Sequence, residues 1–276
     1  MRKVLLLAVS IAILFVLFGC SEKDKNPTKV YGYQLGQFIS KSAVYDSTAH
    51  WSLADSTDMR GLYAYEIVSA DSNHWSPRES SNAGYDLSWN LFKNGFYMAS
   101  DVDQKSWFPN TNLPGAFKVK RVGFFRLYRK VDVIAPDGTS KMVELKGLQT
   151  YQIDNWNTPA TPETAIKLSD LVQGIAVYDS LHLVAVDNFT KTYTPAQINE
   201  GYYLLNSEIT TFPAINNQLS GGLKKFKDLA YIEVFGASAP QTQTFTNAPH
   251  NTADMIILLP SSMNGYTATD VTGLLE

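Results

Sequence analysis

Cysteine and histidine are scarce in this sequence, which limits the chemistry that the chain can carry. The 276 residues include one cysteine, Cys20, so no disulfide can form within the chain. The four histidines have none of the spacings of a zinc site: His50, His74, His182 and His250. Phosphate-binding loops, dinucleotide fingerprints and the G-x-S-x-G motif of hydrolases are also missing. The sequence therefore pairs no nucleophile with a base, and we expect neither a metal nor another cofactor.

An excess of positive charge is also missing. The chain has 23 Lys and Arg residues against 26 Asp and Glu residues, and its net charge is −3. Because the phosphates of nucleic acids require a basic surface, we expect no nucleic-acid partner. Aromatic residues, in contrast, are abundant, with 15 Tyr, 14 Phe and 5 Trp. Such residues favour strands over helices, so the composition predicts a β-rich protein.

The N-terminal stretch has the pattern of a targeting segment. Two basic residues precede an apolar run from Val4 to Phe18, which is shorter than the roughly 20 residues that a membrane span needs. The run ends Leu17-Phe18-Gly19-Cys20, and this ending resembles the lipobox of bacterial lipoproteins. The resemblance implies cleavage before Cys20 and acylation of Cys20. An ordinary signal peptide with a chance cysteine is the alternative.

The lipobox resemblance also implies a location. We expect residues 1–19 to be a lipoprotein signal peptide and residues 20–30 to be a tether between the lipid and the fold. The protein would then lie in a bacterial cell envelope, held to the membrane by its N-terminal lipid, on the periplasmic or extracellular face. The outer membrane is expected rather than the inner one.

One pattern of residues occurs twice, at 88–128 and at 194–235. Each copy contains a helix N-cap, a glycine, an aromatic segment, a Phe-Pro pair and a closing apolar run. Apolar residues of the closing runs match at a constant offset, at positions 119/226, 122/229, 124/231, 125/232, 127/234 and 128/235. Chance similarity of two aromatic-rich strands is the alternative. Agreement in caps, turns and core pattern favours a β-rich α+β protein with two tandem copies of a related domain.

The helix signals of the two copies are equivalent. Ser88 and Thr194 are N-cap residues, and Thr194 has the sequence of a capping box. Gly95 and Gly201 stand where a short helix would end, so we expect both to adopt the left-handed conformation. We also predict an amphipathic helix at 165–175.

The remaining segments complete the predicted domains. Residues 31–135 would form the first domain and residues 140–236 the second, with a turn at Ala135-Pro136-Asp137-Gly138 between them. Residues 237–276 would be a linker and a C-terminal strand segment. The strand is predicted at Met255 to Leu259 and must add to a sheet, because a single strand is not stable alone.

Three stretches of the second copy resemble the oxidoreductase molybdopterin-binding domain of the sulfite oxidase superfamily. They are Leu168-Ser169-Asp170-Leu171-Val172, the strand from Leu183 to Phe189, and the segment from Gly221 to Val234. The resemblance implies a β-rich α+β fold. The family's molybdenum enzymes bind the metal through a cysteine thiolate, and the only cysteine here is the proposed lipid anchor. The resemblance therefore implies a domain that has lost its molybdenum-ligating cysteine.

Two segments contain candidate binding residues. The first predicted domain, residues 31–135, has an insertion relative to the second, Ser72 to Gly84, that contains His74, Trp75 and Arg78, side chains suited to stacking and to anion recognition. A basic run follows later in the copy and includes Lys118, Lys120 and Arg121. This run would bind an anion or a lipid headgroup. An ordinary surface loop and a solvated strand face are the respective alternatives.

These observations favour a lipid-anchored envelope protein without catalytic activity that binds a ligand or partner. Its partners would be the membrane, through the N-terminal lipid, and a protein or small molecule of unknown identity. A cofactor-binding or oxidoreductase-related domain is the second hypothesis, and a purely structural surface protein is the third.

Overall fold

The computed structural model describes residues 28–45, 57–79, 87–175, 177–236 and 253–274. Three sheets and a few short helices make up the described chain, so the β-rich α+β class is confirmed. Cys20 and the predicted signal peptide lie outside the described residues. No helix within the described ranges is long and apolar enough to cross a membrane.

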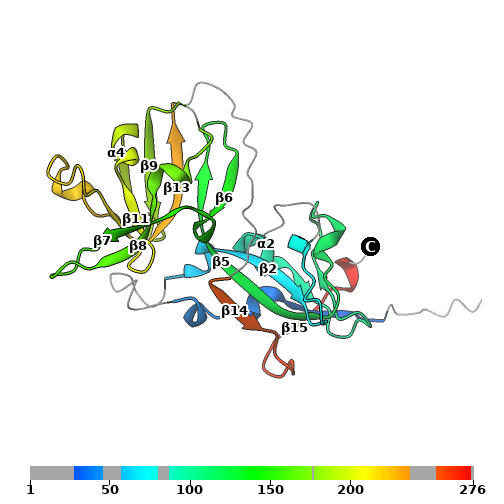
Figure 1. Cartoon of the computed structure of the whole chain (residues 1–276). Coiled ribbons are helices and arrows are strands. Elements are labelled where there is room, and N and C mark those ends of the chain that lie inside the picture. Colours follow the sequence, from blue (N-terminus) through cyan, green and yellow to red (C-terminus); the bar gives the residue numbers. More distant parts are fainter. Residues whose placement is uncertain (1–27, 46–56, 80–86, 176, 237–252, 275–276) are drawn as a thin grey trace, which may run out of the picture.

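The largest sheet has seven strands and runs through the middle of the molecule (Figure 1). Its order is β10-β9-β13-β5-β14, and β2 and β6 also pair with β5. The strands are β2 (Tyr63–Ser69), β5 (Val122–Ile134), β6 (Ser140–Glu144), β9 (Ser180–Ala185), β10 (Thr190–Tyr193), β13 (Leu229–Phe235) and β14 (Met255–Leu258). The strand β14 adds to β5 as the apolar run at the C-terminus predicts.

Two four-stranded sheets flank the large one. The order β15-β1-β3-β4 consists of β15 (Ala268–Asp270), β1 (Tyr31–Gln34), β3 (Phe96–Tyr97) and β4 (Ser106–Trp107). The order β12-β11-β8-β7 consists of β12 (Ile209–Thr211), β11 (Tyr202–Leu204), β8 (Pro162–Lys167) and β7 (Thr150–Asp154). The α-helices are α2 (Trp89–Asn94), α3 (Leu168–Leu171) and α4 (Pro195–Asn199), and the 3₁₀ helices important here are η1 (Leu35–Phe38), η3 (Met59–Leu62) and η4 (Pro77–Glu79).

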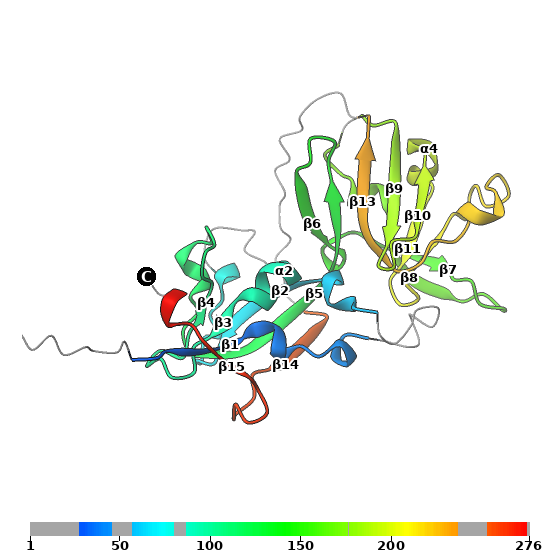
Figure 2. The same cartoon turned by 180° about the vertical axis from the view of Figure 1, so that it is seen from behind.

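The long strand β5 belongs to two hydrophobic cores (Figures 1 and 2). Its first part pairs with β2 and β14, and Phe125 and Leu127 enter one core. Its last part pairs with β6 and β13, and Val131 and Val133 enter the other. We call residues 28–127 with 253–274 the first lobe and residues 131–236 the second lobe. The division between the cores therefore falls inside β5, before the predicted turn at Ala135-Pro136-Asp137-Gly138.

The helix caps are as the sequence predicts. The Ser88 hydroxyl accepts a hydrogen bond from the Leu91 N–H at 3.4 Å. The Thr194 hydroxyl accepts one from the Gln197 N–H at 3.3 Å, and the Gln197 side chain accepts one from the Thr194 N–H at 2.9 Å. This reciprocal pair is the capping box, which satisfies donors that the first turn of a helix leaves unpaired.

The expected left-handed glycines are wrong, and close packing explains their presence instead. Gly95 has a φ of −73°, and Gly201 is not among the residues with positive φ. A Cβ added at Gly95 would lie 2.3 Å from the Phe108 ring, and one at Gly201 would lie 2.6 Å from the Phe212 ring. In each lobe the phenylalanine of the Phe-Pro pair thus occupies the space that a side chain would need.

The helix predicted at 165–175 is wrong at both ends, because residues 165–167 belong to a strand and residues 172–175 are not helical. Residues 162–167 form β8, which pairs with β7 on one side and β11 on the other, and only residues 168–171 are α-helical. Ala165 and Ile166 are fully buried between these neighbours. Pairing with two strands satisfies the backbone of this segment, so tertiary context overrides the helical pattern.

Matching contacts occur in the two lobes. The Leu35 N–H donates to the Gly95 carbonyl at 2.8 Å, and the Leu168 N–H donates to the Gly201 carbonyl at 3.0 Å. A β-bulge interrupts the pairing of β2 with β5 next to Val122, and another interrupts that of β9 with β13 next to Leu229. The residues just before these two, Arg121 and Asp228, have positive φ angles of 49° and 57°. The same kinds of local contact therefore occur in both lobes.

Candidate functional site

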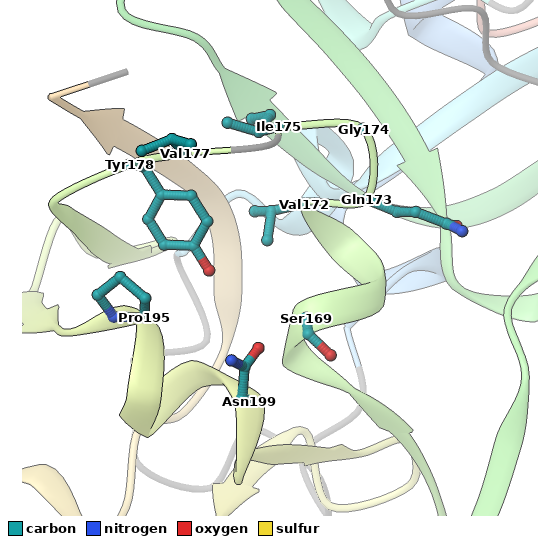
Figure 3. A pocket seen from close by; sticks show the side chains of 9 residues that line it. All are labelled: Ser169, Val172, Gln173, Gly174, Ile175, Val177, Tyr178, Pro195 and Asn199. Atoms are coloured by element: carbon teal, nitrogen blue, oxygen red, sulfur yellow. The ribbon is translucent and has the colours of Figure 1, made fainter. Parts of the chain in front are cut away.

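A hollow of about 390 Å³ lies in the second lobe, between α3, the segment that follows it, and the start of α4 (Figure 3). We call it the second-lobe hollow. Its lining consists of Ser169, Val172, Gln173, Gly174, Ile175, Val177, Tyr178, Pro195 and Asn199. The hollow is open to solvent on one side. Both helices that flank it are held firmly, α4 by its capping box and α3 by the hydrogen bond from Leu168 to Gly201.

The lining combines an apolar floor with uncharged polar groups. Val172 and Ile175 are buried in the second core, and the half-buried Tyr178 packs against the same core. Figure 3 shows the Tyr178 hydroxyl directed into the space above Asn199. Burial raises the pKa of Tyr178, so its hydroxyl is neutral at ordinary pH. Within the described part of the chain, no hydrogen bond occupies the side chains of these polar lining residues: Ser169, Gln173, Tyr178 and Asn199.

Two helices of the first lobe, η1 and α2, pack closely together. A Cβ added at Gly36 of η1 would lie 2.8 Å from the Lys93 Cβ of α2. Trp89 begins α2, and the Arg60 guanidinium lies 4.3 Å above its ring. The contact between η1 and α2 therefore leaves no room for a side chain at Gly36.

The inserted loop of the first lobe packs on the sheet instead of standing away from it. His74 is exposed, and its ring meets the Phe124 ring edge-on with centroids 5.4 Å apart. Trp75 is half-buried against the first core, and its carbonyl accepts a hydrogen bond from the Ser69 N–H at 2.8 Å. Residues 80–84 of the predicted loop lie outside the described residues. Trp75 is thus a packing residue, while His74 remains accessible.

Arg78 connects the two lobes. Its guanidinium forms an ion pair with Glu144 of β6 and lies 3.7 Å above the Tyr128 ring. The side chains of Arg78 and Glu144 are only 8% and 11% exposed. The three candidate residues of the loop therefore do not form one open site, because Arg78 is engaged between the lobes.

A buried carboxylate lies beside this contact. Glu66 of β2 is 1% exposed and accepts hydrogen bonds from Ser76 and from the Tyr128 hydroxyl, the latter at 2.5 Å. Arg126 lies 3.5 Å away and neutralises its charge. Burial, and then the hydrogen bond to Glu66, raise the pKa of Tyr128. With its oxygens occupied in this way, Glu66 holds the loop on the sheet.

The basic run does not form an open cationic surface. Lys120 pairs with Asp103 at 2.9 Å and Arg121 with Asp71 at 3.7 Å, and the two cationic side chains are 66% and 67% exposed. Lys118 is exposed and is the one of the three without a carboxylate partner in the described ranges. Exposed ion pairs of this kind contribute little free energy, but they do reduce the attraction for an anion.

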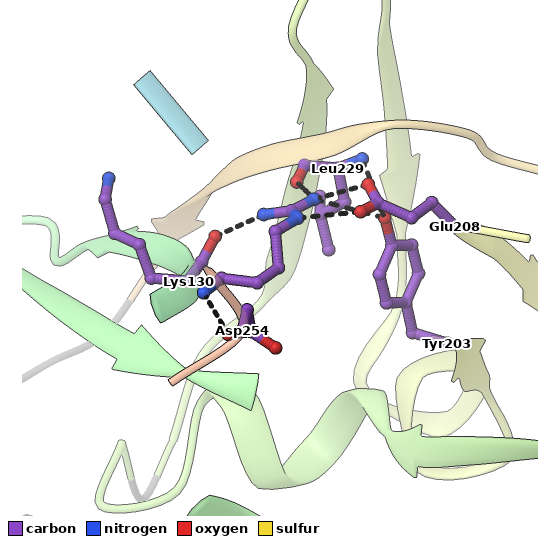
Figure 4. A network of polar contacts seen from close by, with 6 residues as sticks. Lys130, Tyr203, Glu208, Leu229 and Asp254 are labelled. Carbon is purple, nitrogen blue, oxygen red and sulfur yellow. Dashed lines mark hydrogen bonds and ion pairs between the residues drawn. The ribbon is translucent and has the colours of Figure 1, made fainter. Parts of the chain in front are cut away.

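Arg129, at the far end of the same run, is a buried residue of β5, and Figure 4 shows Tyr203, Glu208 and Leu229 of the polar network around it. Its guanidinium donates to both carboxylate oxygens of Glu208, at 3.0 and 2.8 Å. It also donates to the Leu229 carbonyl at 2.7 Å and to the Tyr203 hydroxyl at 3.3 Å. Burial is the largest single influence and opposes the charge of Arg129, but the interactions with Glu208, Tyr203 and Tyr63 together outweigh it and raise the pKa of the guanidinium. This is a structural network, because every donor of it faces the protein interior.

No metal centre is evident in the part of the chain that the structure describes. No three His, Cys, Asp or Glu residues gather there in a way that could hold an ion. His182 lies 3.7 Å from Glu233 and against the Phe235 ring, on the outer face of the sheet. The second-lobe hollow is therefore the strongest candidate site, and sequence reasoning missed it. Its one local signal was the capping box of Thr194, which places Pro195 and Asn199 on a short helix.

Comparisons with protein-family models, with curated proteins and with solved structures each found no match. The resemblance to the molybdopterin-binding domain accordingly stays a prediction.

Proposed function

We propose that the protein is a lipid-anchored cell-envelope protein that binds a small molecule in the second-lobe hollow, without catalysing a reaction. The lining of the hollow is the main support for binding, because an apolar floor and unpaired polar groups lie together there. Its volume of about 390 Å³ lies within the usual range of ligand pockets, roughly 300–1,000 Å³. The lining has no carboxylate, imidazole, amine or thiol, the groups on which acid–base and nucleophilic catalysis usually depend.

The anchor is proposed at Cys20. The apolar run before it and the Leu17-Phe18-Gly19-Cys20 ending support this assignment. Each buried CH₂ group of an acyl chain contributes about 0.8 kcal/mol, and two or more chains give stable attachment. The short polar segment from Ser21 to Thr28, where the described fold begins, would separate the lipid from the first lobe.

Fractionation of cells tests the anchor. Wild-type protein should sediment with membranes and incorporate labelled palmitate, whereas Cys20→Ala should accumulate as unprocessed or misplaced precursor. The change Ser21→Ala is the matched control and should leave both properties intact. Efficient release of unmodified wild-type protein in soluble form would refute the anchor.

We also propose that the two lobes are tandem copies of one domain. Three sets of matched contacts support the duplication: the caps at Ser88 and Thr194, the packed glycines Gly95 and Gly201, and the paired β-bulges. Chance similarity does not lead one to expect agreement in hydrogen bonds as well as in sequence. The second copy would have kept an open site while the first closed it.

A tryptophan placed in the hollow tests binding. Fragment-sized molecules of mixed chemistry would be screened by ligand-observed NMR against the mature protein and against Asn199→Trp, whose indole would fill the hollow. Asn90→Trp, at an exposed position of α2 in the first lobe, is the matched control. Binding should persist in the control and vanish in Asn199→Trp. Fragments that bind both variants equally would show that the hollow is not the site.

A further inference from the structure

We infer that the ligand of the second-lobe hollow is an uncharged sugar, a mono- or disaccharide. This inference rests on the proposed binding function and names the ligand class of the same site. The lining has no charged side chain, so a carboxylate or phosphate would lose hydration without gaining a partner. An uncharged ligand avoids that cost.

Charged residues flank the hollow without lining it. Asp170, Asp179 and Glu200 directly follow the lining residues Ser169, Tyr178 and Asn199, and Lys141 donates from its Nζ to the Gln173 carbonyl at 3.4 Å. The three neighbouring carboxylates disfavour an anion. A cation would find no carboxylate in the lining itself.

The polar groups of the lining suit a ligand with many hydroxyls. The amides of Gln173 and Asn199 each offer donors and an acceptor, and the hydroxyls of Ser169 and Tyr178 offer both. A sugar hydroxyl also donates and accepts, so it can bond to any of the four. A purely apolar ligand would remove these groups from water and leave them unpaired, which is unfavourable.

The apolar part of the lining suits one face of a sugar ring. The aromatic ring of Tyr178 and the apolar pyrrolidine ring of Pro195 line the hollow together with Val172 (Figure 3). A pyranose has a face of C–H groups that packs on such rings, while its hydroxyls extend from the edge. The opening to solvent leaves the outward hydroxyls hydrated. Both polar and apolar halves of the lining are then satisfied by one class of ligand.

The site residues are positioned before any ligand arrives. Pro195 and Asn199 lie on α4, whose first turn is fixed by the Thr194 capping box. Ser169 lies on α3, which is tied to the end of α4 through the bond from Leu168 to Gly201. Preorganisation of this kind lowers the entropy that binding must overcome.

Competition experiments test the sugar assignment. A fragment that binds the wild-type hollow would be displaced with glucose, N-acetylglucosamine, maltose and cellobiose, and with the charged sugars glucuronate and glucosamine. Indole serves as the apolar probe. Neutral sugars should displace the fragment saturably and better than their charged counterparts. Tyr178→Phe should weaken neutral-sugar binding about three- to tenfold, the usual effect of one neutral hydrogen bond, and Asn199→Ala by a similar factor.

Tyr231→Phe is the matched control, since Tyr231 lies on β13 outside the hollow and should leave sugar binding unchanged. If the fragment binds in the hollow but no neutral sugar displaces it, or if glucuronate or indole displaces it better, the sugar inference fails while the proposed function stands. If no fragment binding is lost in Asn199→Trp, the proposed function fails and the sugar inference with it.

Discussion

Removal of Arg129 should strongly destabilise the protein. Arg129→Met keeps much of the apolar stem but leaves the Glu208 carboxylate buried without its cation, since the pair is joined at 3.0 and 2.8 Å and the side chains are 8% and 10% exposed. The Leu229 carbonyl and the Tyr203 hydroxyl also lose a donor. These three partners lie in the second lobe, and the guanidinium also donates to the Lys130 carbonyl of β5 itself.

The expected loss follows from the burial of the pair. Removing one partner of a buried ion pair costs about 3–5 kcal/mol, because an uncompensated charge is left in the interior. Each kcal/mol corresponds to roughly 2–4 °C in Tm for a chain of this size, so Tm should fall by about 6–20 °C. The double variant Arg129→Met, Glu208→Leu removes both charges and should cost clearly less than the two single changes together.

Urea unfolding of the mature protein, followed by circular dichroism, measures these free energies. Lys120→Gln is the control, because its pair with Asp103 is 66% and 37% exposed and should contribute less than about 1 kcal/mol. If Arg129→Met changes the free energy of unfolding no more than Lys120→Gln does, the buried network is not important for stability. Strictly additive single and double variants would equally contradict the reasoning.

Two further predictions concern packing and pH. Gly95→Ala and Gly201→Ala should each destabilise by roughly 1–3 kcal/mol in urea unfolding, because the new Cβ overlaps a core ring, whereas Gly221→Ala, whose Cβ meets nothing within 4 Å, should change stability little. Burial raises the pKa of Tyr65 and Tyr203 above their ordinary value of about 10, so the unfolded chain ionises first and stability should fall as the pH rises above about 10. Tyrosinate absorbance should then appear together with loss of circular dichroism, and complete ionisation of the folded protein would contradict this.

The sequence predicts local features of the fold well. The caps at Ser88 and Thr194 and the strand at Met255–Leu258 depend on residues that are neighbours along the chain. Features that depend on distant partners were predicted less well. Ala165 is part of a strand because β7 and β11 pair with it from both sides, and no local pattern records those partners. The packed glycines lie at the predicted positions, but the predicted left-handed conformation is wrong. They are needed there because a phenylalanine ring occupies the space of a side chain.

The same limit applies to the candidate sites. The basic run suggests an anion site only as long as its carboxylate partners are unknown. Glu208 lies 79 residues from Arg129, and Glu144 lies 66 residues from Arg78. The second-lobe hollow depends on the meeting of residues 169–178 with residues 195–199, which only the tertiary structure brings together. The spacing of residues along the chain does not show which distant residues come together in the fold.

The two lobes differ in a way that favours the second for the proposed binding. In the first lobe, Ser76 donates to the buried Glu66, and Arg78 is paired with Glu144. A ligand at these loop residues would have to break existing bonds. In the second lobe, Tyr178 and Asn199 remain unpaired within the described chain. Unpaired polar groups are tolerated only where water or a ligand reaches them, and the second-lobe hollow provides that access.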